Sequence, residues 1–445
     1  MDGTEVRQRP ISLAEELRNA NNEPRATSDE SDMDQFLQDE DRLADRTKLL
    51  PQGSDNMGAL VDSFLSGLDP RWRNWVVRGI FTIVMVSLFS LIVSKGPLWL
   101  MLLVFAIQFK CFHEIISIGL AVYRLFNLPW FRTLSWYFLF TSNYFFFGES
   151  LVEFWGILLK RDNFLHLLIQ YHRLISFGLY CIGFVWFVLS LQKGYYVRQF
   201  SLFAWTHVCL LLVVSQSFLI IQNIFQGLIW FLVPVAMIIC CDIMSYMFGF
   251  AFGKTPLIKL SPKKTWEGFI GGAFSTVLFG LLLSYALLGK PAMVCPLEDY
   301  TTEQYNCTIP SSFLIHEAEY PVFLKWPMKL LRQPTTFKFY PFLFHSISLS
   351  LFASILGPFG GFFASGFKRA FKIKDFGDVI PGHGGLMDRF DCQLLMGTFV
   401  NVYIHSFIRV PNLSKLLQNI SLLPSEDQLT IFNALQEELK TAGLI

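Results

Sequence analysis

The chain has 445 residues, of which 53% are hydrophobic and only 16% are charged. Its mean hydropathy is +0.43, whereas a soluble domain carries about 25% charged residues. These values exclude a single soluble core and indicate a membrane protein surrounded by membrane lipids. The net charge of +1 gives no reason to expect a nucleic acid as a partner.

Residues 1–70 have almost no apolar periodicity and are dense in Asp, Glu, Asn and Ser. They lack the basic and then apolar pattern of a cleavable signal peptide. We therefore predict a disordered acidic N-terminal tail. Arg71, Arg73 and Arg78 follow it directly, and positive charge marks the cytosolic flank of a span, so the tail is expected to be cytosolic.

Apolar runs long enough to cross a bilayer recur throughout residues 71–410. They predict an all-α polytopic membrane protein with about nine transmembrane helices, and this region is the expected catalytic domain. The expected spans are 79–93, 98–117, 130–149, 173–191, 200–222, 227–250, 268–288, 343–364 and 391–408.

The loops between these spans differ in charge, which supports their alternation across the membrane. Three basic loops are expected on the cytosolic side, and they contain Lys193 and Arg198, then Lys254, Lys259, Lys263 and Lys264, then Lys368, Arg369, Lys372 and Lys374. The loop 290–342 is expected to be lumenal, where Asn306-Cys307-Thr308 would be a glycosylation acceptor. A disulfide between Cys295 and Cys307 is one interpretation of its cysteines, while the other six fall in or beside apolar runs as small hydrophobic residues.

Residues 411–445 are predicted to form a C-terminal amphipathic tail. Within 426–444, apolar residues recur near helical spacing and predict a short helix. These residues are Leu429, Ile431, Phe432, Leu435 and Leu439. Nine spans would place the tail in the lumen, but the sequence does not fix its side.

Two stretches that are rich in polar residues interrupt the apolar runs of the sequence. The first begins at Asp242, which lies in an otherwise apolar span. A carboxylate there costs about 3 kcal/mol or more unless it is paired or bound to a metal ion. Both a structural ion pair with a neighbouring helix and a catalytic or metal-binding role remain open for it.

The same stretch continues with Ser261-Pro262-Lys263-Lys264-Thr265-Trp266-Glu267-Gly268 and opens directly into the next expected span. Ammonium groups neutralise a polyphosphate, hydroxyls donate to its oxygens, and a helix N-terminus adds positive partial charge. We predict a phosphate-binding site that includes Ser261, Lys263, Lys264, Thr265 and Glu267. Ordinary positive-inside charge would explain the lysines but not the residues around them. A Walker P-loop at 253–255 is rejected, because Phe248 stands where that motif needs its first Gly.

The second stretch runs from Gly357 to Asp391 and is rich in glycines, which let the backbone approach a ligand closely. Asp388 and Asp391 are three residues apart at the start of an expected helix, so both carboxylates share one face. Mg²⁺ prefers such oxygen ligands together with bound phosphate. A purely structural ion pair between Arg389 and Asp388 is the alternative interpretation.

His383 lies between glycines in this stretch. It could be a general base, but a phosphate monoester is already ionised near neutral pH, since its second pKa is about 6. A phosphate hydrogen bond or an ordering role in the loop is therefore favoured.

The second stretch resembles the signature of the phosphatidate cytidylyltransferases, or CDP-diacylglycerol synthases. The matching residues are Ser365, Lys368-Arg369, Lys374-Asp375, Gly377, His383-Gly384-Gly385 and Asp388-Arg389-Phe390-Asp391. The run 261–268 is similar to the second shared motif of the family, and Asp242 matches the acidic position before it. The resemblance covers residues 75–420 and points to an animal member.

This resemblance implies an enzyme of the endoplasmic reticulum membrane that uses Mg²⁺, with CTP and phosphatidate as substrates and CDP-diacylglycerol and pyrophosphate as products. Lys263, Lys264, Lys368, Arg369, His383 and Arg389 are the expected catalytic residues, and Gly384 and Gly385 are expected to contact the nucleotide. Bacterial members carry an Asp in a Gly-Asp-Leu run where this chain has Gly361. Asp388 is the expected metal ligand, and its partner remains open among Asp391, Asp375 and Asp242.

We expect a phosphatidate oxygen to attack the α-phosphorus of CTP in line, with catalysis by placement and charge neutralisation. The product would serve phospholipid synthesis, including phosphatidylinositol, phosphatidylglycerol and cardiolipin. Two alternatives are a CTP-dependent lipid kinase of the polyprenol type and a membrane transporter or scaffold. Acyl-chain preference, paralogue identity, regulation by the tail and a homo-oligomeric state stay open.

Overall fold

The computed structural model describes residues 70–123, 129–159, 168, 170–259, 261–296, 309–319, 336–379, 384–408, 416–417 and 420–443. The chain divides into two compact units, Met1–Thr398 and Phe399–Ile445. Almost all of the expected N-terminal tail, the glycosylation acceptor and His383 lie outside the described residues.

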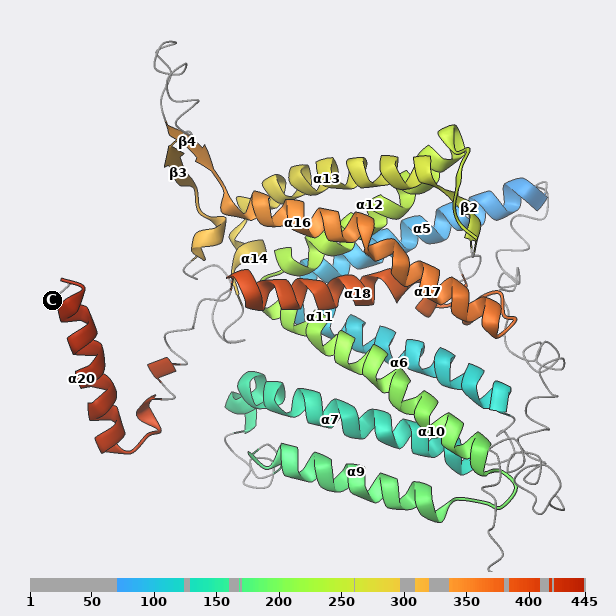
Figure 1. Cartoon of the computed structure of the whole chain (residues 1–445), viewed down its shortest axis with the longest axis horizontal. Coiled ribbons are helices and arrows are strands. Elements are labelled where there is room, and N and C mark those ends of the chain that lie inside the picture. Colours follow the sequence, from blue (N-terminus) through green and yellow to red (C-terminus); the bar gives the residue numbers. More distant parts are fainter. Residues whose placement is uncertain are drawn as a thin grey trace, which may run out of the picture. The chain divides into compact units, whose positions relative to one another are not determined.

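The described part of the first unit is mainly helical (Figure 1). Its helices are α5 (Pro70–Lys95), α6 (Pro97–Tyr123), α7 (Pro129–Leu159), α9 (His172–Leu189), α10 (Tyr196–Leu210), α11 (Gln216–Phe225), α12 (Ile229–Phe252), α13 (Trp266–Leu288), α14 (Pro291–Val294), α16 (Pro341–Ile355), α17 (Gly357–Ala370) and the start of α18 (Met387–Tyr403). A π-helical turn, Leu211–Ser215, joins α10 to α11.

Six helical segments in the described ranges are long and apolar enough to cross a membrane. They are Pro97–Tyr123, His172–Leu189, Tyr196–Phe225, Ile229–Phe252, Trp266–Leu288 and Pro341–Ala370. Each of them coincides with an expected span. The other expected spans, 79–93, 130–149 and 391–408, also fall in helices, namely α5, α7 and α18 with the π-helical turn Ile404–Ile408, but these helices do not meet the same length and hydropathy criteria.

The expected span 343–364 is not one uninterrupted helix. It is interrupted at Leu356, where α16 ends and α17 begins. Pro358, in the first turn of α17, has no N–H with which to continue the helical hydrogen bonds across this point. The second segment, α17, then carries the basic end of the signature stretch.

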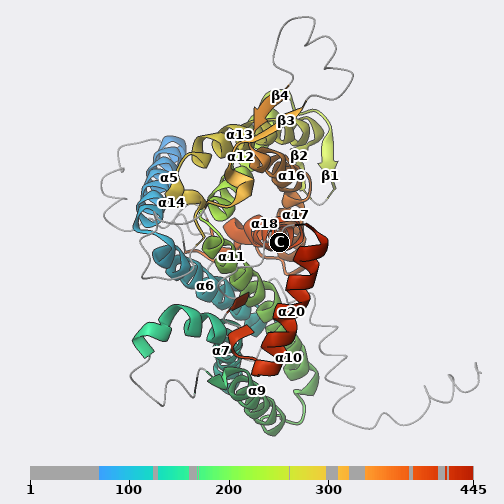
Figure 2. The same ribbon diagram turned by 90° about the vertical axis from the view of Figure 1, so that its left-hand side faces the viewer.

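Glycines bring α12, α13 and α16 into close contact. A side-chain carbon added at Gly268 of α13 would lie 2.6 Å from the backbone oxygen of Ser245 of α12, and one added at Gly272 would collide with the Ser245 hydroxyl. On the opposite part of α13, a carbon at Gly280 would meet Ser350 of α16. Small residues allow helix backbones to approach each other in a membrane protein, and these helices form one group in both views (Figures 1 and 2).

Two antiparallel hairpins supplement the helices, which the sequence prediction of an all-α fold did not include. β1 (Pro256–Ile258) pairs with β2 (Ser261–Thr265), and β3 (His316–Glu319) pairs with β4 (Thr336–Phe339). The β1–β2 hairpin connects α12 to α13, so the expected phosphate loop is a strand that runs straight into a helix.

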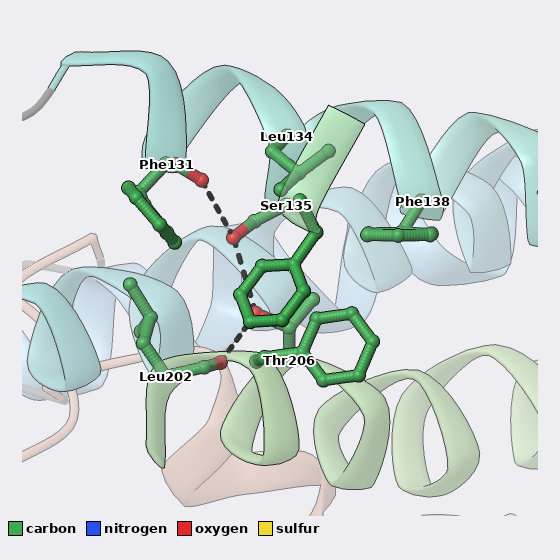
Figure 3. A pocket seen from close by; sticks show the side chains of 8 residues that line it. Phe131, Leu134, Ser135, Phe138, Leu202 and Thr206 are labelled. Atoms are coloured by element: carbon green, nitrogen blue, oxygen red, sulfur yellow. Dashed lines mark hydrogen bonds between the residues drawn. The ribbon is translucent and has the colours of Figure 1, made fainter. Parts of the chain in front are cut away.

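A second helix group contains α7, α9 and α10 (Figure 2). A small pocket among these helices is lined mostly by apolar and aromatic side chains (Figure 3): Phe131, Leu134, Ser135, Phe138, Phe187, Leu202, Phe203 and Thr206. Its two hydroxyls, of Ser135 and Thr206, are hydrogen-bonded to each other at 3.1 Å. This pocket is lined by no charged side chain, and its buried apolar residues belong to the same core as Ala364, Ile373 and Phe376 of the second polar stretch.

The helix α20 (Ser425–Thr441) lies in the second unit and confirms the helix expected within 426–444. None of its residues is buried. Its apolar positions Leu429, Phe432 and Leu435 are all exposed.

The described cysteines agree with the sequence interpretation. Cys295 is disulfide-bonded, and the six other described cysteines are free. The expected partner, Cys307, lies outside the described residues.

Candidate functional site

The end of α17 and the start of α18 bring three charged residues together, which we call the anchor cluster: Lys368, Asp375 and Asp388. Lys368 Nζ lies 2.5 Å from Asp388 Oδ1, and the Asp388 side chain is only 7% exposed. The other oxygen, Oδ2, accepts hydrogen bonds from the N–H groups of Phe376 at 2.9 Å and Gly385 at 3.2 Å. Both oxygens of Asp388 therefore have protein partners.

Asp375 lies beside this pair and has a perturbed acidity. Burial raises the pKa of Asp375 above its usual range, and the nearby carboxylate of Asp388 raises it further, while Lys368 acts in the opposite direction. Gly384 has a φ of +80°, which favours glycine, and a side-chain carbon there would approach the Asp375 carboxyl to 3.2 Å. The first glycine after His383 thus allows the turn to pass close to this acid.

Glu114 of α6 reaches the same turn from a distant part of the chain. Its Oε1 accepts the N–H of Leu386 and its Oε2 accepts the N–H of Met387, each at 2.9 Å. Glu114 is 5% exposed. We call the described residues 376–379 and 384–388 the signature turn, because they flank or belong to the signature and because backbone N–H groups among them are bound by both Asp388 and Glu114.

We call a second group of charged residues the open cluster: Asp242, Lys264 and Asp391. A side-chain carbon added at Gly361 would lie 3.7 Å from both Lys264 Nζ and Asp391 Oδ2, so these charges face the position that carries only a hydrogen here. Lys264 Nζ also lies 4.5 Å from the centre of the Phe362 ring. Within the described ranges no hydrogen bond joins Lys264 to a carboxylate.

Asp242 is exposed on α12 and interacts electrostatically with Lys264, Asp391 and Arg389. Asp391 in turn interacts with Lys368 and Asp388. Asp391 therefore lies between the two clusters, and Asp242 has Lys264 of the β1–β2 hairpin as a cationic neighbour. Each of the four acids that the sequence singled out interacts electrostatically with at least one of the others.

The β1–β2 hairpin is fixed to α13 by two predicted phosphate-site residues. Thr265 caps the helix, because its hydroxyl accepts the Gly268 N–H at 3.3 Å. Glu267 accepts the Thr255 hydroxyl at 2.7 Å and the Lys254 N–H at 3.1 Å. Both side chains thus order the backbone that carries Lys264.

Among the remaining predicted residues, Arg389 interacts electrostatically with Asp242 and Asp375. Arg369 and Arg389 are exposed, and Ser261 is half-buried in β2. The side chain of Lys263 and the whole of His383 lie outside the described residues, so their roles stay predictions.

The acids fit a Mg²⁺ ion that is held together with substrate phosphate. No group of three or more His, Cys, Asp and Glu side chains in the described ranges is arranged to hold a metal by itself. Mg²⁺ is commonly bound by one or two carboxylates plus phosphate oxygens and waters. Asp391, beside the space over Gly361 and near Asp242 and Asp388, has the required donor type.

Comparison with known proteins agrees with the signature. Residues 76–407 match the profile of the family described as "Cytidylyltransferase family". The chain is 68% identical to a phosphatidate cytidylyltransferase of Caenorhabditis elegans, covering 100% of this chain and 98% of that protein. It is 54% identical to phosphatidate cytidylyltransferase 1 of Homo sapiens, covering 97% of this chain and 94% of the relative. The chain belongs to the phosphatidate cytidylyltransferase family. As a member of this family it is a multi-pass membrane nucleotidyltransferase, and the expected enzyme class is confirmed.

Sequence reasoning missed Glu114. The signal was available, because Glu114 is the only acidic residue of α6, just as Asp242 is the only acid of its own helix. Its partners, however, lie 272 and 273 residues later in the chain and are backbone N–H groups. A contact with backbone groups leaves no side-chain pattern in the sequence from which it could be predicted.

Proposed function

We propose that the anchor and open clusters together form the active site in which this chain transfers CMP from CTP to phosphatidate. The reaction, which gives CDP-diacylglycerol and pyrophosphate, is that of the family to which the chain belongs. The observation that carries the site assignment is the meeting of Lys264, Asp391 and Asp242 around Gly361, next to the Lys368–Asp388 pair. Four elements contribute these groups, namely α12, β2, α17 and α18.

Both substrates are anions, so the site must first overcome their repulsion. Lys264 and Lys368, with their sequence neighbours Lys263 and Arg369 and with Arg389 next to Asp388, would neutralise phosphate charge and hold the two substrates against each other. A phosphatidate oxygen would then attack the α-phosphorus of CTP in line, and pyrophosphate would leave. A general base is not required for an ionised phosphate; His383 is therefore assigned to binding phosphate or ordering the turn.

Mg²⁺ is the proposed metal ion. When bound, it would neutralise charge on the phosphate oxygens. Asp388 and Asp391 are the proposed ligands, with Asp242 and Asp375 as the neighbouring acids. Because Lys368 and two backbone N–H groups already hold Asp388, this chain fixes that carboxylate in place without substrate.

We assign the site to the cytosolic face of the endoplasmic reticulum membrane, in a domain of nine spans between a disordered cytosolic tail, 1–70, and the C-terminal tail, 411–445. The argument rests on loop charge: Lys254, Lys259 and Lys264 lie in and beside the β1–β2 hairpin, and positive residues favour the cytosolic side. Cys295, in a disulfide, belongs to the loop assigned to the oxidising lumen.

A direct test is to incubate the purified protein in detergent with labelled CTP and phosphatidate, with Mg²⁺ or with EDTA. Label should enter the lipid phase as a nucleotide lipid only when Mg²⁺ is present. A phosphorylated lipid without nucleotide would support the kinase alternative and contradict the proposal. Label transfer that EDTA does not reduce would contradict the metal assignment.

A further inference from the structure

We propose that Glu114 is a positioning residue, which holds the signature turn against α6 so that Asp388 and Lys368 meet in their active geometry. This inference rests on the proposed assignment of Asp388 to the active site. Glu114 itself lies outside every stretch that the sequence associates with the chemistry.

The environment of Glu114 requires an explanation. It is an acid in a helix otherwise made of apolar residues with a few basic and polar ones, and it is 5% exposed. Acidic side chains in membrane-spanning helices are rare and pair with charged groups or the backbone. Here the carboxylate accepts two consecutive backbone N–H groups at the first turn of α18, those of Leu386 and Met387.

These two N–H groups belong to the part of a helix that has no intrahelical acceptors. A carboxylate at this place satisfies them and also interacts favourably with the positive end of the helix. Asp388 follows Met387 directly, so Glu114 fixes the backbone from which the Asp388 side chain projects. The two carboxylates hold different sides of one turn, since Asp388 accepts N–H groups of Phe376 and Gly385.

The glycines of the signature turn provide an independent observation. A side-chain carbon added at Gly377 would have three atoms of Glu114 as its nearest neighbours, the closest being Oε1 at 2.8 Å. One added at Gly385 would lie 2.8 Å from Glu114 Oε2 and 2.7 Å from the Gly377 nitrogen. Gly377 does not have a positive φ, so its small size is required by Glu114 and not by its backbone conformation.

The geometry therefore explains why two positions of the signature are small: they form the seat of a carboxylate that comes from α6. Removing that carboxylate leaves the turn with room to move. Lys368 and Asp388 would then meet in several arrangements, and the active one would be populated less. Substrate binding by the exposed lysines would change little.

The test uses Glu114→Gln in the full-length protein. The amide keeps the size of the side chain but replaces one acceptor oxygen with a donor that faces an N–H group. We expect kcat to fall by about 10- to 100-fold, while KM for CTP and for phosphatidate stays within about 3-fold. Hydrogen–deuterium exchange of a peptide that covers residues 384–390 should become faster. Gln108→Met is the matched control, because Gln108 is buried on the same helix and bonds Asn143 instead; it should leave kcat and this exchange unchanged.

A double-mutant cycle tests the seat itself. Gly377→Ala should lower kcat strongly in the wild-type background but cause little further loss in Glu114→Ala, because the atoms that it would meet are gone. Additive effects would contradict the contact. If Glu114→Gln left the hydrogen–deuterium exchange of residues 384–390 unchanged, Glu114 would not hold the signature turn. If the exchange became faster but kcat did not change, the positioning role would be overturned. Full activity of Asp388→Asn would instead overturn the site assignment on which the role depends.

Discussion

The anchor cluster and the open cluster use the same residue types in different ways. In the anchor cluster both oxygens of Asp388 are bound by protein donors, and Glu114 holds the adjoining backbone. In the open cluster Lys264 is exposed, contacts the Phe362 ring and lies with Asp391 beside Gly361. Charges that the protein already pairs have a fixed position, whereas the exposed Lys264 can turn toward a bound phosphate. We therefore expect the anchor cluster to present Asp388 in a preset position and the open cluster to adapt to the substrates.

The largest effect is expected from removing the charge of the anchor cluster. Asp388→Asn should lower kcat by about 10³-fold or more, since it removes both a fixed charge and the partner of Lys368. The isosteric amide should keep the protein monodisperse in gel filtration. Activity within a few-fold of the wild type, measured as nucleotide lipid formed, would show that this carboxylate only supports the fold.

Substitutions in the open cluster are expected to lower kcat/KM while leaving the stability of the protein unchanged. Lys264→Met should lower kcat/KM by about 10- to 100-fold, the loss expected for one hydrogen bond to a charged group, with an unchanged melting temperature because Lys264 is exposed. Lys259→Met is the control, since Lys259 is an exposed lysine at the end of β1. Equal losses in the two variants would mean that the hairpin contributes only general positive charge.

Gly361 offers a finer way to separate the clusters. A side chain there would enter the space between Lys264 and Asp391. If a cation occupies this space, Gly361→Asp should retain about 5-fold more activity than Gly361→Asn, because only the carboxylate can act as a charged ligand. Titration of both variants with Mg²⁺ gives the comparison, and an Asp variant less active than the Asn variant would place the metal elsewhere.

The smallest effect on chemistry is expected from the packing that supports the open cluster. Gly268→Ala should destabilise the protein by about 1–3 kcal/mol, because the added carbon would meet the Ser245 backbone. Gly289→Ala has nothing within 4 Å of the added carbon and should leave the melting temperature unchanged. Thermal unfolding in detergent compares the two, and equal melting temperatures would show that α12 and α13 can separate without loss.

Hydropathy predicted the helical regions well, because every expected span falls in helical structure and six of the nine coincide with segments long and apolar enough to cross a membrane. It did not predict the β1–β2 hairpin, since a strand of Ser, Pro, Lys and Thr has no alternating pattern. The signature placed Asp388 and Lys368 in one expected site but did not predict their ion pair, and the motif at 261–268 placed Lys264 in the expected phosphate-binding site. The motif could not show that Thr265 and Glu267 order the backbone of the hairpin, because their hydroxyl and carboxylate groups are suited both to capping a helix and to a phosphate site.

The contact between Glu114 and the start of α18 also has a consequence for biosynthesis. A ribosome adds about 5–20 residues per second, so the 272 residues that separate Glu114 from Leu386 take roughly 14 to 54 s to synthesise. During that interval α6 is already made, but its acid has not met the N–H groups that it binds in the finished protein. The nascent chain therefore passes through a stage in which a carboxylate near the membrane awaits its partner, and a chain that stops before residue 386 never completes this step.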